Sequence, residues 1–249
     1  MTFVITKHDY ILELLEDIIQ QGAQARTDVI VCSAREDFVG QILAELYRHH
    51  LENQPEGTSP EDDEDDNEGE SRIPSPTHIL LSKALHVLNS SQLVHLYFCP
   101  TITLFRGFLS GYGTSLTTAS QSNGSMVVLN LLAMHHGTSE FNLQGLSQTL
   151  ASAVSAAHRT GRDLRLVECK DIKDPANPSR GWPLWEAEVQ LLSAAIRIGE
   201  AGQNWGRRTI SVMKIASRWF KVDDSREARH EERGATAQET GASEEEMLV

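Results

Sequence analysis

Polar residues follow an apolar run near the middle of the chain, in the stretch MVVLNLLAMHHG from Met126 to Gly137. Four apolar residues precede Asn130, and His135 and His136 follow it. A carboxylate at the end of such a buried strand is one way to hold Mg²⁺ for phosphate chemistry. An amide is neutral and binds a hard cation more weakly, so Asn130 predicts a structural use of this position.

A phosphate-binding loop would need glycines, a lysine and a hydroxyl residue between a strand and a helix. The stretch after Val31, CSAREDFVG, has no glycine before Gly40 and no lysine. Its cation, Arg35, is followed by Glu36 and Asp37, which favour the helix dipole but repel a phosphate. We therefore expect an ordinary helix start here, with Ser33 as the N-cap, and no bound nucleotide.

Metal and nucleophile chemistry have little support in the sequence. His135 and His136 are adjacent, so on a strand they would point to opposite faces, and the expectation is two solvent-facing turn residues. No GxSxG motif occurs. Glu168 and Asp171, near the end of a later strand, are either functional or serve as a cap and an ion-pair partner. No metal and no cofactor is expected.

The C-terminal part interleaves basic and aromatic residues. Its members are Trp205, Arg207, Arg208, Lys214, Arg218, Trp219 and Lys221. Such a mixture fits a protein interface rich in Trp and Arg, a charge-protected edge strand, or a surface that contacts nucleic acid. The sequence leaves these three alternatives open, and the protein interface is the favoured one.

The charge of the chain is unevenly distributed. The formal net charge is -13 over 249 residues. Nine acidic residues between Glu56 and Glu70 and a net six between Val222 and Val249 account for more than this excess, so the remaining residues carry +2. A nearly neutral folded part with two acidic appendages does not favour nucleic acid as a direct partner.

Apolar runs and helical periodicity alternate along the chain. Strands are expected at Asp28–Cys32, Leu93–Cys99, Met126–Leu132, Asp163–Cys169 and Arg207–Phe220, and Trp185–Ile198 fits a strand or a helix, with the strand favoured. Helices are expected at Asp9–Gln21, Glu36–His50, Thr77–Asn89, Thr101–Ser110 and Glu140–Thr160. The first four strands lack polar alternation, which is typical of strands buried on both faces. The pattern predicts a three-layer α/β/α domain with a mainly parallel sheet.

We expect one domain over residues 1–221. A disordered acidic insertion interrupts it at residues 52–76, and a disordered acidic tail follows at residues 222–249. Cys32, Cys99 and Cys169 lie in or beside apolar runs without CxxC spacing, which indicates buried, reduced thiols. No apolar run is long enough for a membrane span, and the N-terminus does not fit a signal peptide, so the nucleus or the cytoplasm is expected.

The order of these segments resembles the core of RecA-type ATPases, and especially their degenerate, non-hydrolysing relatives. Those relatives include the Elongator accessory subunits and the recombinase paralogues of Shu-type complexes. The resemblance covers roughly Asp28 to Phe220 without the acidic insertion. The matching segments are DVIVCSAREDFVGQIL, LVHLYFCPTITLFRGFLSGY, MVVLNLLAMHHGTSEFNLQGLSQTLASAVSAAHRTG, DLRLVEC and RRTISVMKIASRWF. The details also resemble proteins of filamentous fungi. The most specific RecA motifs are missing, because no GKT-like loop follows Cys32 and Asn130 stands at the position of the acidic residue.

The resemblance implies a degenerate nucleotide site at Ser33, Arg35 and Asn130, and assembly with another RecA-like subunit. The leading hypothesis is therefore a non-catalytic scaffold in DNA repair, recombination or an Elongator-like tRNA-modification complex. One alternative is an enzyme whose site lies at the strand ends around Ser33, Arg35, Asn130 and Glu168. The other is direct nucleic-acid binding through the basic and aromatic residues of 205–221.

Overall fold

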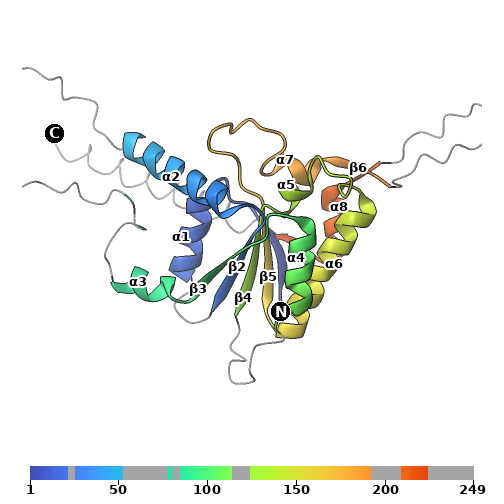
Figure 1. Ribbon diagram of the computed structural model, residues 1–249, viewed down its shortest axis with the longest axis horizontal. Coiled ribbons are helices and arrows are strands. Elements are labelled where there is room, and N and C mark those ends of the chain that lie inside the picture. The colour runs from blue at the N-terminus through green and yellow to red at the C-terminus, as the bar shows by residue number, and fades with distance from the viewer. Residues whose placement is uncertain are drawn as a thin grey trace, which may run out of the picture.

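The computed structural model describes residues 1–21, 26–52, 78, 80, 85–113, 124–191 and 209–223. Its main elements form an α/β domain with the sheet in the middle (Figure 1). The strands of the main sheet are β1 (Phe3–Thr6), β2 (Thr27–Val31), β3 (Val94–Phe98), β4 (Ser125–Leu129), β5 (Asp163–Val167) and β8 (Lys221–Asp223). The helices are α1 (Ile11–Gln21), α2 (Arg35–Glu52), α3 (Leu85–Ser91), α4 (Ile102–Gly111), α5 (Leu131–His135), α6 (Leu143–Thr160), α7 (Pro183–Glu186) and α8 (Val212–Ala216).

The six strands pair in the order β3-β2-β4-β5-β1-β8, and every pair is parallel. The central strands are in register, with Val31 opposite Leu129 and Leu129 opposite Val167. Their carboxyl ends therefore lie at one level along the same edge of the sheet. A parallel pair needs a crossover, and helices supply it on both faces.

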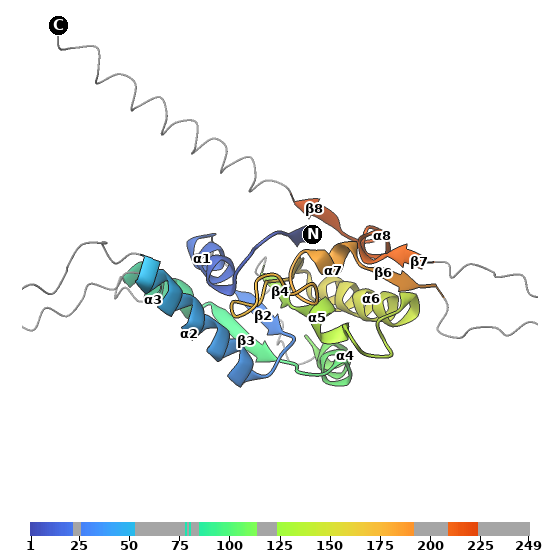
Figure 2. The same cartoon turned by 90° about the horizontal axis from the view of Figure 1, so that it is seen from above.

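The two faces of the sheet have separate cores. One core joins α1 and α2 to residues such as Val29, Val127 and Val167. The other joins α4, α6 and α8 to the alternate residues of the same strands, such as Ile30, Val128 and Leu166. Because successive side chains of a strand point to opposite faces, both sets must be apolar, and the predicted three-layer α/β/α arrangement with a parallel sheet is confirmed (Figure 2).

Strand β1 is the element that the sequence analysis missed. It has four residues, FVIT, and lies inside the sheet between β5 and β8. Ile5 is fully buried there. A four-residue run directly before a helix gives too short a pattern for a strand to be recognised from periodicity. The strand predicted first, at Asp28–Cys32, is therefore the second strand, β2.

The predicted strand at Met126–Leu132 is wrong beyond Leu129. Asn130 takes a left-handed backbone conformation, with φ 60° and ψ 39°, and α5 begins at the next residue. An extended strand cannot continue through that conformation, although the apolar run does. The predicted helix at Glu140–Thr160 begins three residues later as α6, after the N-cap Asn142, and ends at Gly161 with φ 68°.

The C-terminal predictions need a larger correction. Of the strand predicted at Trp185–Ile198, residues 192–198 lie outside the described residues. In the described part, Trp185 lies in the short helix α7, and β6 (Glu188–Gln190) pairs antiparallel with β7 (Thr209–Ser211). The strand predicted over Arg207–Phe220 contains helix α8, because the side chain of Ser211 accepts a hydrogen bond from Lys214 N and begins a helical turn. The chain then forms β8, which extends to Asp223, two residues into the predicted acidic tail.

The remaining helices follow the predictions with shifted ends. The helix predicted at Thr77–Asn89 is described only in part, and there α3 runs from Leu85 to Ser91, two residues beyond the predicted end. Residues 53–76 of the predicted insertion and residues 224–249 of the predicted tail lie outside the described residues. Over the helices that the structure describes, none is long and apolar enough to span a membrane.

Candidate functional site

The candidate site is the edge of the sheet where the strands end. In open parallel sheets, ligands bind outside the carboxyl ends of the strands. Ser33, Asn130 and Glu168 follow the ends of β2, β4 and β5, three adjacent strands in register. The structure therefore brings the residues predicted for a degenerate nucleotide site to one edge. The contacts of each side chain at this edge decide whether it can still bind a ligand or a cation.

Asn130 joins the ends of two strands. Its side-chain oxygen accepts a hydrogen bond from Cys169 N at 2.9 Å, and its own N–H donates to Val167 O at 2.8 Å. The residue is buried, and asparagine is one of the few non-glycine residues that readily adopt its left-handed conformation. The oxygen that would have to face a cation therefore serves the protein's own backbone, in agreement with the predicted structural use.

Glu168 caps helix α5. Its carboxylate accepts hydrogen bonds from Leu132 N at 2.6 Å and Ala133 N at 3.3 Å, the free N–H groups of the first turn. Burial raises the pKa of Glu168 to about 8, although these backbone bonds and the charge of Arg180 oppose the shift. Of the two alternatives predicted for Glu168, the contacts match the cap.

A second buried carboxylate caps the helix that follows β1. Glu45 lies in α2 and is fully buried. It accepts hydrogen bonds from Ile11 N at 3.1 Å and Leu12 N at 2.7 Å, at the start of α1. Burial raises the pKa of Glu45 as well. The sequence analysis did not single out Glu45. A signal was present, because Glu45 shares the inward face of a helix with Phe38, Ile42 and His49, and a carboxylate on such a face requires a hydrogen-bond partner.

Ser33 and Arg35 do not form a phosphate loop. The Ser33 hydroxyl donates to Ala34 O at 3.3 Å, and α2 begins at Arg35, so Ala34 precedes the helix and the predicted N-cap role of Ser33 is wrong. Arg35 is exposed at the start of α2.

The three cysteines lie at this edge or just below it. Cys32, Cys99 and Cys169 follow β2, β3 and β5, and all three are buried and free, as predicted. Burial raises the pKa of each thiol, and the nearby Glu168 carboxylate adds to the shift at Cys32 and Cys169. A thiol held in its neutral form is a poor nucleophile.

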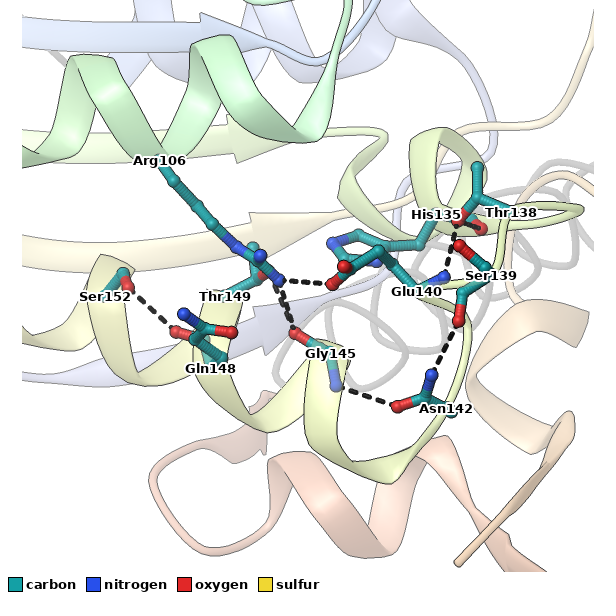
Figure 3. Close-up of polar contacts among 10 residues, drawn as sticks. All are labelled: Arg106, His135, Thr138, Ser139, Glu140, Asn142, Gly145, Gln148, Thr149 and Ser152. Carbon is teal, nitrogen blue, oxygen red and sulfur yellow. Dashed lines mark hydrogen bonds and ion pairs between the residues drawn. The ribbon is translucent and has the colours of Figure 1, made fainter. Parts of the chain in front are cut away.

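The prediction that His135 and His136 both face solvent is wrong for His135. Because α5 is helical, His135 points inward and is fully buried, while His136 is exposed and its ring lies 5.2 Å from that of Phe141. The His135 ring lies beside Glu140 (Figure 3). Burial lowers the pKa of His135 to about 4, so the imidazole is neutral at physiological pH.

Arg106 holds the loop between α5 and α6 (Figure 3). Its guanidinium donates to the Glu140 carboxylate at 2.9 Å, to Gly145 O at 3.0 Å and to the Thr149 hydroxyl at 2.8 Å. The Arg106 guanidinium thus has three acceptors, and through them it joins α4 to α6. We interpret the cluster as structural.

A further buried polar cluster lies at the opposite end of the sheet. Asp28, in β2, accepts hydrogen bonds from Arg26 at 2.7 Å, Arg162 at 2.8 Å and the Tyr112 hydroxyl at 2.6 Å. Burial, followed by the hydrogen bond to Asp28, raises the pKa of Tyr112. These groups satisfy one another, and they lie away from the edge at which ligands bind in such sheets.

The basic and aromatic residues of the C-terminal part are described only in part. Trp205, Arg207 and Arg208 lie outside the described residues. Lys214, Arg218 and Lys221 are exposed. Trp219 is partly buried against the core, with the Arg218 guanidinium 5.3 Å from its ring centre. Trp219 therefore has a packing role, and Lys214, Arg218 and Lys221 face solvent.

Among the described residues, no group of three or more His, Cys, Asp and Glu side chains could hold a metal ion. No protein-family model, curated protein or solved structure matches the chain.

Proposed function

We propose that this protein is a non-catalytic, RecA-like subunit that acts by contact with other proteins. The observation that carries the proposal is the internal use of the sheet edge at which a nucleotide would bind. Helices α1, α2, α4 and α5 begin there, and the first turns of α1 and α5 are each capped by a buried carboxylate of the chain itself.

A helix N-terminus binds phosphate because its free N–H groups point at the anion and the helix dipole attracts it. Glu45 takes the N–H groups of Ile11 and Leu12, and Glu168 takes those of Leu132 and Ala133. A phosphate would have to displace a buried carboxylate to reach these donors. The two caps therefore disfavour nucleotide binding at α1 and α5. At α2, the exposed Glu36 and Asp37 of the first turn repel a phosphate.

The loops and the cation position support the same conclusion. Residues 7–10, between β1 and α1, contain no glycine, and neither do residues 32–34 between β2 and α2. Asn130 uses its side-chain oxygen to hold Cys169 N. The all-parallel sheet with helices on both faces supports the RecA-like part of the proposal, since the resemblance implies that arrangement.

The test has two parts. Purified full-length protein is titrated with ATP and with ADP in the presence of Mg²⁺ by isothermal calorimetry, and hydrolysis is followed by phosphate release. We expect any Kd to be weaker than about 1 mM and no turnover. Saturable binding with turnover would contradict the proposal.

The second part addresses the partner. Tagged full-length protein is purified from its own cells, and the co-purifying proteins are identified by mass spectrometry. We expect a RecA-like protein in stoichiometric amount, from a repair, recombination or tRNA-modification assembly. Its absence in a preparation that contains other stoichiometric partners would count against the RecA-like partner and leave the lack of nucleotide binding untouched.

A further inference from the structure

Cys32 and Cys99 occupy matching positions at the ends of two neighbouring strands. Strands β2 and β3 are parallel, with Val31 opposite Phe98. The hydrogen bond from Cys99 N to Val31 O, at 2.8 Å, continues this ladder by one residue, so Cys32 and Cys99 are the next pair in register. In-register Cα atoms of neighbouring strands lie roughly 4.8 Å apart. A disulfide needs a Cα separation of about 4.4 to 6.8 Å, which this backbone provides.

The side chains of the two cysteines lie on the same face of the sheet. Val31 and Phe98 pack in the core beside α1 and α2, and successive side chains of a strand point to opposite faces. Cys32 and Cys99 accordingly belong to the other core, beside α4. Cys169, the third cysteine of the chain, lies in the core on the α1 and α2 side. The fold thus brings two of the three thiols together and leaves the third on the opposite face.

We propose that Cys32 and Cys99 form a redox pair, which a hydroperoxide oxidises to an intramolecular disulfide and a small thiol reduces again. In the first step the sulfur of Cys99 attacks the O–O bond, which breaks and gives a sulfenic acid and an alcohol. The sulfur of Cys32 then attacks the sulfenic sulfur, the S–S bond forms and water leaves. The two thiols lose two electrons, which reduce the peroxide, and their two protons leave in the alcohol and the water. Two molecules of a small thiol reverse the reaction and become a disulfide themselves.

Burial of the pair sets the partner, the order and the rate of these steps. Each cysteine is only 4% exposed, so its thiol is closed to a cysteine of another protein, and the oxidant must be a small molecule. Burial raises the pKa of both thiols, and raises it further at Cys32, where Glu168 and Cys99 add to the shift. Cys99 therefore forms the reactive thiolate more easily, and Cys32 resolves the sulfenic acid. Because both thiols are neutral at pH 7, oxidation is slow there and becomes faster as pH rises.

The disulfide fastens the edge of the sheet. Among the described strands, β3 stands at the end of the main sheet and has β2 as its one neighbour. A bond between Cys32 and Cys99 closes the chain over residues 33–98 and ties the end of β3 to β2. Closing a loop of this length restricts the unfolded chain, so β3 separates from β2 less often in the oxidised protein. This inference goes beyond the proposed function, because the two thiols meet whether or not the strand ends bind a nucleotide.

Peroxide treatment of reduced full-length protein tests the pair. Samples are oxidised with hydrogen peroxide at pH 7 and at about pH 9, unfolded, alkylated and mapped by mass spectrometry. We expect a linked Cys32–Cys99 peptide that forms faster at the higher pH, an alkylated Cys169, and complete reversal by dithiothreitol. Cys169→Ser is the matched control and should form the same disulfide at the same rate. Oxidation of methionines without a linked peptide, or equal linkage of Cys169, would overturn the proposal.

Single variants test the order of the two steps. In Cys32→Ser the sulfenic acid of Cys99 has no resolving thiol, so we expect it to accumulate and to be trapped by dimedone. In Cys99→Ser we expect much less trapping at Cys32. Equal trapping in the two variants would overturn the assignment of Cys99 as the attacking thiol.

Hydrogen exchange of the oxidised and reduced wild-type proteins tests the effect on the sheet. We expect the amides of β3 to exchange at least about tenfold more slowly in the oxidised protein, and those of β5 to be unchanged. Equal exchange of β3 in the two forms would overturn the inference that the disulfide fastens this strand.

Discussion

Glu45 and Glu168 each accept two N–H groups from the first turn of a helix, and each is buried while doing so. Burial disfavours the charged carboxylate, and the backbone bonds favour it. In both residues burial has the larger effect, so the pKa is raised. The two carboxyl groups therefore satisfy buried N–H groups, and their contribution to the free energy of unfolding depends on pH.

Glu168→Gln should change the pH dependence of stability. Between the ordinary value of 4.5 and the native pKa of about 8, the native state binds more protons at Glu168 than the unfolded state does. The contribution of Glu168 to the free energy of unfolding therefore falls as pH rises through this window, by up to about 5 kcal/mol. The glutamine variant loses this slope. Urea unfolding of both proteins across the window measures the difference.

The exposed Glu186, in α7, supplies the control for this experiment. We expect Glu186→Gln to follow the wild-type pH dependence. Parallel curves for the wild type and Glu168→Gln would show that the buried carboxyl is not the cause of the slope.

Removing the Glu45 cap should destabilise the protein strongly. Glu45→Ala leaves Ile11 N and Leu12 N without an acceptor in a buried place, which costs about 3 kcal/mol. Glu45→Gln keeps one acceptor oxygen, so its loss should be about 1 kcal/mol. Chemical denaturation at one pH compares the two variants. Equal losses would mean that the hydrogen bonds to α1 are not what Glu45 contributes.

At the scale of elements, a glycine in α4 and a glycine in α6 have different surroundings. Gly107 is exposed in α4, and an added Cβ would meet nothing within 4 Å. Gly145 is buried in the first turn of α6, and an added Cβ would collide with the carbonyl oxygen of Glu140. One glycine only weakens its helix, and the other lets the α5–α6 loop pass close to the helix.

Substitution by alanine should separate the two glycines. Gly107→Ala gains helix propensity and should raise the free energy of unfolding by about 0.5 to 1 kcal/mol. Gly145→Ala must displace the backbone and should lower the free energy of unfolding by about 2 kcal/mol or more. Thermal and urea unfolding of both variants provide the comparison. A gain in stability at Gly145 would contradict the described packing against Glu140.

The elements that could be predicted from the sequence are those with long patterns. Strand β2 contains the buried apolar run VIV, β5 buries Leu164, Leu166 and Val167, and α6 repeats its apolar residues over 18 positions. Strand β1 is too short for such a pattern. Helix α5 was missed because the apolar run continues through it, and the conformation of Asn130 that ends β4 leaves no trace in periodicity. Long-range contacts decide such cases.

The candidate site was predictable in position and less so in detail. Asn130 and Glu168 follow apolar strands, which places them at the sheet edge. The partner of Glu168 is the helix that was not predicted, so its role as a cap of α5 could not be derived. Glu45 acts on amides 33 and 34 positions earlier in the chain, a distance over which spacing carries no information.

At the scale of the whole molecule, Asp28 joins parts of the chain that are far apart in sequence. Its partners are Arg26 in the approach to β2, Tyr112 after α4 and Arg162 before β5. Asp28 and Arg162 are both nearly fully buried, whereas the Arg26 side chain is 32% exposed. The two arginines therefore contribute unequally to the network.

Arg162→Met should cost about 3 to 5 kcal/mol, because it leaves the buried carboxylate without its buried partner. Arg26→Met removes a partly exposed partner and should cost about 1 kcal/mol. Urea unfolding of both variants measures the ratio. Similar losses at the two positions would show that burial does not set the value of these ion pairs.

The internal position of β1 has a consequence for synthesis of the chain on the ribosome. Phe3 and Val4 are synthesised long before their strand partners, Leu164 and Lys221. FVIT therefore has no strand partner until β5 has emerged, and its second edge stays unpaired until β8 has emerged. Contacts this distant in sequence form slowly and leave a strand free to pair wrongly in the meantime. We expect nascent chains that end before β8 to depend on chaperones, and completed chains to be released from them.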